Sequence, residues 1–155
     1  MELNGTDLLD LAESLARDAH AGQTDKLGND YIDHPRRVME RALFMAPSQD
    51  RFDCAAAAWL HDVVEDSDVS LEDLRRQGVP DRVVEAVDRL TKQPGVSPAD
   101  YFARIREHEI ARMVKAADLA DNCDPSRFSR LPFPTQYRLS TKYSESWGLL
   151  MGTTA

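Results

Sequence analysis

The sequence contains no long hydrophobic segment and few cysteines, and both features restrict what the protein can be. No apolar run approaches the ~20 residues that a transmembrane helix requires, so we expect a soluble chain. The polar start "MELNGTD" does not have the pattern of a signal peptide. Cys54 and Cys123 fit no paired metal spacing, so we expect two reduced thiols and a cytoplasmic location.

Positive charge is also scarce. The chain has 19 lysines and arginines against 27 aspartates and glutamates, which gives a formal net charge of −8. Such a chain is not expected to bind nucleic acid or an anionic membrane. A small anionic ligand remains compatible, provided that cationic residues or a bound metal ion concentrate positive charge at one site. We therefore expect a small-molecule partner, and the composition leaves the oligomeric state open.

Alternating strand patterns, internal repeats and low-complexity segments are all missing, and apolar residues instead recur at helical spacing. The first such face follows Thr6, a candidate N-cap, and consists of Leu8, Leu11, Ala12, Leu15, Ala16 and Ala19. Comparable patterns begin near Pro35, Phe52, Ser70, Asp81 and Ala99, and a last one presents Leu139, Tyr143, Trp147 and Leu150. We predict one all-α domain over residues 1–155, a bundle of seven or eight helices without significant sheet.

The third predicted helix ends in an acidic cluster, "LHDVVEDSD". His61 lies four residues before Glu65, and Asp62 four residues before Asp66, so the two pairs would form adjacent columns on one helix. Carboxylates at a helix C-terminus are unfavourable without a compensating cation. A solvated acidic helix end is the alternative. The preceding apolar "AAAAWL" places His61 and Asp62 at the edge of the core, where imidazole and carboxylate would suit Mn²⁺, Zn²⁺ or Fe²⁺.

Two other segments carry polar residues in suggestive positions. In "VKAADLADN", Lys115, Asp118 and Asn122 lie at positions i, i+3 and i+7, which is one line along a helix. Such a line is unusual for a plain solvated face, and a lone surface salt bridge is the alternative explanation. In "YIDHP", His34 directly precedes Pro35 at the predicted start of the second helix.

Taken in order, these segments resemble the HD-domain metal-dependent phosphohydrolases. Within them, the chain is most similar to the hydrolase domain of the RelA/SpoT alarmone enzymes and their small stand-alone relatives. The resemblance rests on "AHAGQTDKLGNDYIDHP", "HDVVED", "RLTK" and "KAADLADN", and it extends from about residue 19 to residue 122. Only about thirty residues follow, so the resemblance implies no alarmone-synthesis activity.

The resemblance assigns roles to particular residues. It implies one divalent metal, most often Mn²⁺ with Zn²⁺ or Fe²⁺ also possible, bound by His34, His61, Asp62 and Asp118. It implies that Glu65 and Asp66 act in the hydrolysis of the 3′-pyrophosphate of ppGpp, and that Asn122 contacts the nucleotide. Lys26 falls near a basic position that neutralises substrate phosphates.

General chemistry supports the same assignments. A divalent metal generates a nucleophile from water near neutral pH, and Glu65 or Asp66 could move the proton as a general acid or base. Lys26 and Lys115 could hold phosphate oxygens. Further candidates for that role are Arg36, Arg37 and Lys92.

The chain also departs from the family pattern. Asp121 and Asp124 stand where relatives often carry a histidine and an arginine, and Lys26 has no second cation beside it. Both departures weaken positive charge near a polyphosphate. Two alternatives therefore stay open: a hydrolase of another nucleotide, such as a nucleoside monophosphate or a nicotinamide dinucleotide phosphate, and a metal-binding regulatory module without turnover. The sequence assigns no role to His20 or Tyr143.

Overall fold

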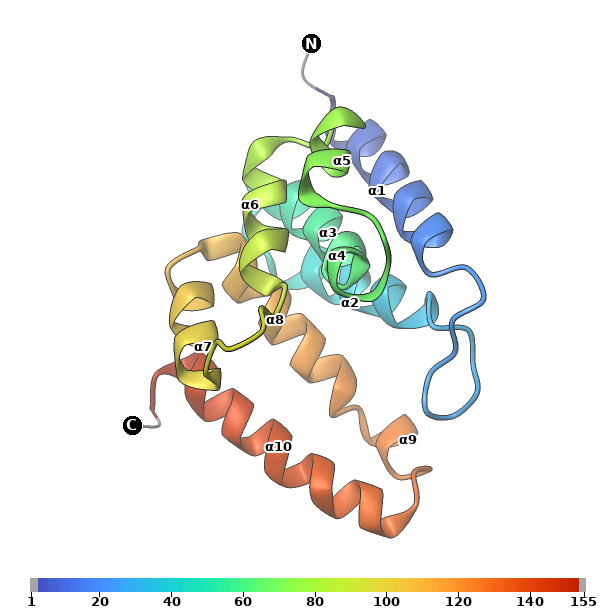
Figure 1. Ribbon diagram of the computed structural model, residues 1–155, viewed down its shortest axis with the longest axis vertical. Coiled ribbons are helices and arrows are strands. Elements are labelled where there is room, and N and C mark those ends of the chain that lie inside the picture. The colour runs from blue at the N-terminus through green and yellow to red at the C-terminus, as the bar shows by residue number, and fades with distance from the viewer. Residues whose placement is uncertain (1–2, 154–155) are drawn as a thin grey trace.

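The computed structural model describes residues 3–153, which fold into ten helical segments (Figure 1). They are α1 (Gly5–Ala19), α2 (Asp33–Met45), α3 (Arg51–Leu60), α4 (Val63–Asp66), α5 (Leu71–Arg76), α6 (Asp81–Leu90), α7 (Pro98–Arg106), α8 (Glu109–Asn122), α9 (Pro125–Phe128) and α10 (Phe133–Met151). Residues 3–153 contain no strand, only an isolated antiparallel bridge between Thr24 and Asp30. The all-α prediction is confirmed, although α4 and α9 add two single turns to the expected helices. The predicted domain limits, residues 1 and 155, lie outside the described residues.

Helix α3 forms the centre of the molecule. Every residue from Cys54 to Leu60 is buried, and α1, α2, α6 and α8 all pack against it. Four of those residues are alanines, whose short side chains let the surrounding helices approach closely. The apolar stripes of the neighbouring helices complete one continuous core, and burial of this surface supplies the main stabilisation of the fold.

Side-chain caps begin five of the ten described helices, namely α1, α5, α7, α8 and α9. Ser70 and Asp73 form the capping box that the sequence predicts at the start of α5. His108 accepts a hydrogen bond from the Ala111 N–H at 3.3 Å, which explains the predicted break between α7 and α8. The predicted cap at Thr6 is wrong, because α1 begins at Gly5 and Asn4 Oδ1 accepts from the Asp7 N–H at 2.9 Å.

The helix that should carry the whole acidic cluster is interrupted. α3 ends at Leu60, and His61 and Asp62 form a turn before the short α4. In this turn the two side chains approach each other, with His61 Nε2 and Asp62 Oδ2 3.0 Å apart. The prediction of one continuous helix through the acidic cluster is therefore wrong, although the Asp66 N–H still donates to the Asp62 carbonyl oxygen at 3.0 Å, as in a helix.

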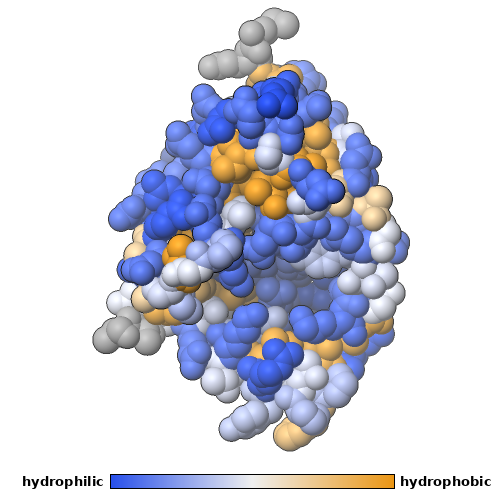
Figure 2. Space-filling model, in the orientation of Figure 1, coloured by the Kyte–Doolittle hydropathy of each residue, from blue (hydrophilic) through white to orange (hydrophobic). Residues whose placement is uncertain are grey.

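Helix α10 lies along the outer side of α7 and α8 (Figure 1). The space-filling view shows a hollow between this helix and the main body of the protein, bordered largely by hydrophilic residues (Figure 2). No helix within residues 3–153 is long and apolar enough to cross a membrane.

Candidate metal centre

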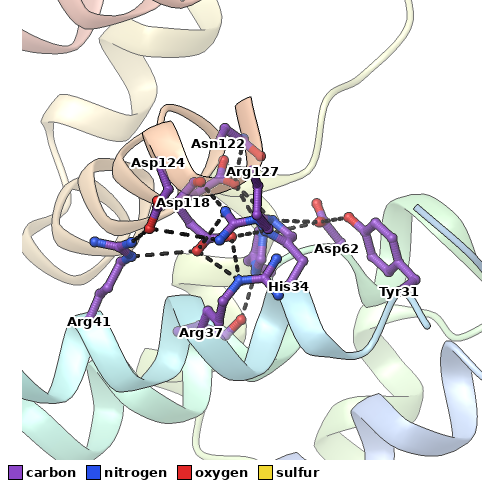
Figure 3. Close-up of polar contacts among 12 residues, drawn as sticks. Tyr31, His34, Arg37, Arg41, Asp62, Asp118, Asn122, Asp124 and Arg127 are labelled. Carbon is purple, nitrogen blue, oxygen red and sulfur yellow. Dashed lines mark hydrogen bonds and ion pairs between the residues drawn. The ribbon is translucent and has the colours of Figure 1, made fainter. Parts of the chain in front are cut away.

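Side chains from three helical segments meet in one polar cluster (Figure 3), which lines a cavity of the protein. His34 comes from the first turn of α2, and His61 and Asp62 come from the turn between α3 and α4. One ligand atom from each of these residues lies within 4.8 Å of the others, so the three form a group that could hold a metal ion. Both histidines are buried, and Asp62 is partly exposed.

Asp118 joins this group from the middle of α8. Its Oδ1 lies 3.0 Å from His34 Nε2 and 3.6 Å from His61 Nε2. Asp62 Oδ2 lies 3.9 Å and 3.0 Å from the same two nitrogen atoms. The structure therefore brings together all four residues that the sequence proposes as ligands, and the two carboxylates approach the same pair of imidazoles.

The tautomers of the two histidines fit a cation. His61 Nδ1 donates to the Ala58 carbonyl oxygen at 2.6 Å, and His34 Nδ1 donates to Asp121 Oδ2 at 2.7 Å. In the neutral imidazoles, both Nε2 atoms therefore carry lone pairs toward the carboxylates. His61 Nε2 is buried and has no hydrogen-bond partner within the described residues. Two imidazole nitrogens and two carboxylates are a donor set that suits a first-row divalent metal.

The electrostatics of the cluster also favour a cation. Burial alone would lower the pKa of His61, but the charge of Asp62 and contacts with Asp118 raise it well above its usual value. Burial alone would raise the pKa of Asp118, but Lys115 and the two histidines hold it well below the usual range. Both carboxylates are therefore ionised near neutral pH, and their field attracts positive charge to the space between the imidazoles.

Tyr31 supports the centre from the loop that precedes α2. Its hydroxyl donates a hydrogen bond to Asp62 Oδ2 at 2.5 Å, and its ring lies against those of His20 and His34. The sequence includes Tyr31 in the matching "YIDHP" segment, but its spacing gives no sign of the contact with Asp62. The hydrogen bond restricts the orientation of the Asp62 carboxylate. Residues that bond to a metal ligand in this way commonly support metal sites.

Replacing Tyr31 with phenylalanine is expected to weaken Mn²⁺ binding by about tenfold, since partners of metal ligands typically contribute about 10–100-fold to affinity. The change removes one hydroxyl and leaves the ring packing in place. Isothermal titration of the metal-stripped protein measures the affinity, and Tyr137→Phe, on the exposed face of α10, serves as the control. Equal affinities for the two variants would contradict a role for the hydroxyl.

A cavity of about 460 Å³ opens from the cluster. This volume suits a small-molecule ligand, for which pockets of roughly 300–1,000 Å³ are usual. Its walls come from the loop before α2, from the end of α6 and the loop after it, and from α2, α4, α7, α8, α9 and α10. Six acidic side chains line it, and so do six cationic ones: Lys26, Arg37, Lys92, Lys115, Arg127 and Lys142.

The two acidic residues assigned to hydrolysis both line the cavity, but their surroundings differ. Glu65 Oε1 accepts a hydrogen bond from the Lys92 backbone N–H at 2.8 Å, which links α4 to the loop after α6. Asp66 is exposed, and burial of part of its surface together with the charges of Asp62 and Glu65 raises its pKa. Glu65 thus supports a loop, whereas the Asp66 carboxylate can take up a proton more readily than an ordinary aspartate.

The three residues assigned to substrate binding also line the cavity, and two of them contact Asp118, a candidate metal ligand. Lys115 Nζ lies 2.9 Å from Asp118 Oδ2, and Asn122 Nδ2 donates to Asp118 Oδ1 at 3.1 Å. These contacts account for the i, i+3, i+7 line in the sequence. Lys26 is exposed on the loop before α2. Arg36, a further candidate, instead pairs with Glu40 on the surface of α2.

Several cavity residues carry no signal in the sequence. Lys142 and Tyr143 reach the cavity from α10, whose spacing indicates only a core stripe. Burial and the nearby Lys92, Lys26 and Lys115 lower the pKa of Lys142, so these four ammonium groups share one region. Phe128 reaches the cavity from α9. His20, in contrast, is buried behind Tyr31 and bonds Gln23 Oε1 through Nδ1 at 2.8 Å.

Comparison with known proteins gives a consistent picture. The family model described as "HD domain" matches residues 31–126. A guanosine-3′,5′-bis(diphosphate) 3′-pyrophosphohydrolase of Vibrio cholerae is 44% identical over 78 residues, which is 50% of this chain and 10% of that protein. A GTP pyrophosphokinase of Streptomyces coelicolor is 40% identical over 115 residues, which is 73% of this chain and 12% of that protein. The chain thus spans about a tenth of the length of these curated relatives.

One solved structure shares the fold over nearly the whole chain. It is described as "A metazoan ortholog of SpoT hydrolyzes ppGpp and plays a role in starvation responses". The TM-score is 0.75 and the sequences are 22% identical, with 96% of this chain and 88% of the other covered. At this identity the likeness establishes the fold.

Proposed function

The chain belongs to the HD-domain family, and we propose that it is a metal-dependent hydrolase that removes the 3′-pyrophosphate of guanosine polyphosphate alarmones. The products would be GDP or GTP and pyrophosphate. The observation that carries this proposal is the juxtaposition of a histidine and carboxylate cluster with a cavity lined by six cations. The names of the relatives, among them the bifunctional (p)ppGpp synthase/hydrolase SpoT of Escherichia coli, support the choice of substrate.

In this proposal His34, His61, Asp62 and Asp118 would hold one divalent cation. The chemistry that such a cation supplies is activation of water near neutral pH and polarisation of a phosphoryl oxygen. Lys115 and Asn122 keep the Asp118 carboxylate oriented, and Tyr31 does the same for Asp62. Mn²⁺ is the preferred candidate, and the donor set also suits Zn²⁺ or Fe²⁺.

Asp66 is the group that we propose handles the proton. Its carboxylate is exposed to the cavity beside the cluster, and its raised pKa brings it closer to the operating pH that favours general acid or base catalysis. Glu65 instead positions the loop that carries Lys92 through the 2.8 Å hydrogen bond to the backbone. Lys92 can then direct its ammonium group at the phosphates of the ligand.

The remaining cations would bind the 5′ and 3′ diphosphate groups of the substrate. Lys26, Lys92 and Lys142 enter the cavity from three different segments, and their charges offset the acidity of the rest of the chain. Asp121, whose position in the sequence counts against a polyphosphate ligand, is fully buried and paired with arginines. Its charge is therefore neutralised locally, and the departure from the family pattern does not weaken the proposal.

A substrate panel tests the proposal. With Mn²⁺ present, we expect ppGpp to yield GDP and pyrophosphate, measured by separate assays for pyrophosphate and orthophosphate. Release of orthophosphate from a nucleoside monophosphate or from NADPH, without turnover of ppGpp, would contradict it and favour another nucleotide substrate. A folded, metal-loaded protein that is inert on the whole panel would indicate a binding module.

A further inference from the structure

Within residues 3–153, Asp121 carries the one fully buried carboxylate near the cluster that the proposed mechanism does not use. We propose that Asp121 is a positioning residue, which fixes the orientation and tautomer of His34 so that Nε2 points into the metal cluster. The inference rests on the proposed role of His34 as a metal ligand. Nothing in the matched motifs assigns such a role to this position, where the family pattern often carries a histidine.

The contact itself is short and enclosed. Asp121 has 0% of its surface exposed, and its Oδ2 accepts from His34 Nδ1 at 2.7 Å. A carboxylate accepts hydrogen bonds but has no proton to donate when ionised, so Nδ1 must carry the hydrogen. The lone pair of His34 is thereby assigned to Nε2, which faces Asp118 at 3.0 Å. On His61 the Ala58 carbonyl oxygen has the same effect, so each histidine has its own acceptor.

Three arginines hold the Asp121 carboxylate in place. Arg37 Nε, Arg41 Nε and Arg127 Nη2 lie 3.0, 3.5 and 3.1 Å from its Oδ1, and Arg37 Nε also donates to Oδ2 at 3.3 Å (Figure 3). Three guanidinium groups face this one buried carboxylate, and their positive charges favour its ionised form. The group is therefore ionised, and an ionised acceptor makes the imidazole a stronger ligand than a neutral one does.

The spacing on α2 matches this arrangement. His34, Arg37 and Arg41 lie at positions i, i+3 and i+7, so one face of α2 presents the histidine and two of the arginines to the end of α8. Arg127 approaches the same carboxylate from α9 and also donates to the Asp121 backbone carbonyl. Asp121 thus connects His34 of α2 directly to α8 and, through Arg127, to α9.

A purely structural role is the competing explanation, since the same contacts join α2 to α8 and α9. Asp124 provides the comparison. It pairs with Arg41 at 2.8 Å and with Arg127 at 3.8 Å, but no contact joins it to His34. If the arginines only fasten helices together, the loss of either aspartate should have the same kind of effect.

Mn²⁺ affinity of the metal-stripped full chain, measured by isothermal titration, separates the two explanations. We expect Asp121→Ala to weaken binding by about 10–100-fold, the usual effect of removing the partner of a ligand histidine. Asp124→Ala is the matched control and should bind Mn²⁺ as the wild type does. Thermal unfolding of each variant, followed by circular dichroism, reports the structural contribution separately.

A double-mutant cycle makes the test specific to His34. If Asp121 acts through His34, adding Asp121→Ala to His34→Ala should cause no further loss of affinity. Additive losses, or an equal loss in Asp124→Ala, would overturn the inference. Should Asp121→Ala fail to fold, Asp121→Ser replaces it, because its hydroxyl is too short to accept from His34 Nδ1, and the expected loss is again about 10–100-fold. Wild-type affinity in folded Asp121→Ser would also overturn the inference.

The same measurements distinguish this inference from the proposed function. If His34→Ala leaves Mn²⁺ affinity unchanged, the proposed metal role of His34 fails, and the inference fails with it. If His34→Ala weakens binding and Asp121→Ala does not, only the positioning role of Asp121 is lost.

Discussion

Replacing Asp62 with alanine is expected to lower the Mn²⁺-dependent release of pyrophosphate from ppGpp on the order of a thousandfold. A catalytic metal contributes several kcal/mol to the transition state, and each 1.36 kcal/mol changes the rate tenfold. The Asp62 carboxylate lies 3.0 Å and 3.9 Å from the two imidazole Nε2 atoms, so its loss removes both a ligand and the negative charge that attracts the cation. Initial rates from a pyrophosphate assay measure the effect.

Asp68 supplies the matched control for this experiment. It belongs to the same acidic run, is exposed, and does not line the cavity. Asp68→Ala should therefore keep wild-type activity. A loss of activity in this variant would mean that the total negative charge of the segment matters. Equal rates for Asp62→Ala and the wild type would eliminate the proposed metal role of Asp62.

Replacing Asp66 with asparagine is expected to lower the turnover number by about 10²–10⁴-fold, the range typical of a lost general acid or base. The amide has nearly the same shape as the carboxylate but cannot exchange the proton. Because Asp66 is exposed and caps no helix, the variant should keep the stability and the Mn²⁺ affinity of the wild type. Steady-state kinetics at saturating ppGpp and Mn²⁺ isolate the turnover number from binding.

Glu65→Gln is the informative comparison for that variant. The glutamine side-chain oxygen can still accept from the Lys92 N–H, so a purely positional role predicts a much smaller loss than in Asp66→Asn. A larger loss in Glu65→Gln than in Asp66→Asn would reverse the two assignments. Glu65→Ala should raise KM, because it frees the loop that carries Lys92.

Local sequence patterns predict a large part of this architecture. Apolar spacing identifies the helices, since each must bury one face, and the capping box at Ser70 and the break at His108 follow from short-range chemistry. The regular i, i+3, i+7 line of Lys115, Asp118 and Asn122 predicts their mutual contacts for the same reason. Such features depend on residues close in the sequence, where helix geometry fixes the distances.

Contacts between distant segments could not be predicted in this way. The hydrogen bond between His34 and Asp121 joins residues 87 positions apart, and that between Tyr31 and Asp62 joins residues 31 apart. Helical periodicity contains no information on either pairing. The turn at His61 and Asp62 also escapes local analysis, because the spacing of His61, Asp62, Glu65 and Asp66 fits a continuous helix equally well.

The wall contributed by α10 has an evolutionary consequence. Lys142 and Tyr143 lie beyond the stretch that matches the family model, whereas the four candidate ligands lie within it. We therefore expect that the outer helix can change more readily than the candidate ligands, so that ligand preference can shift while the reactive centre is kept. Chimaeras that exchange residues 133–151 between homologues would be the natural way to retune such a protein.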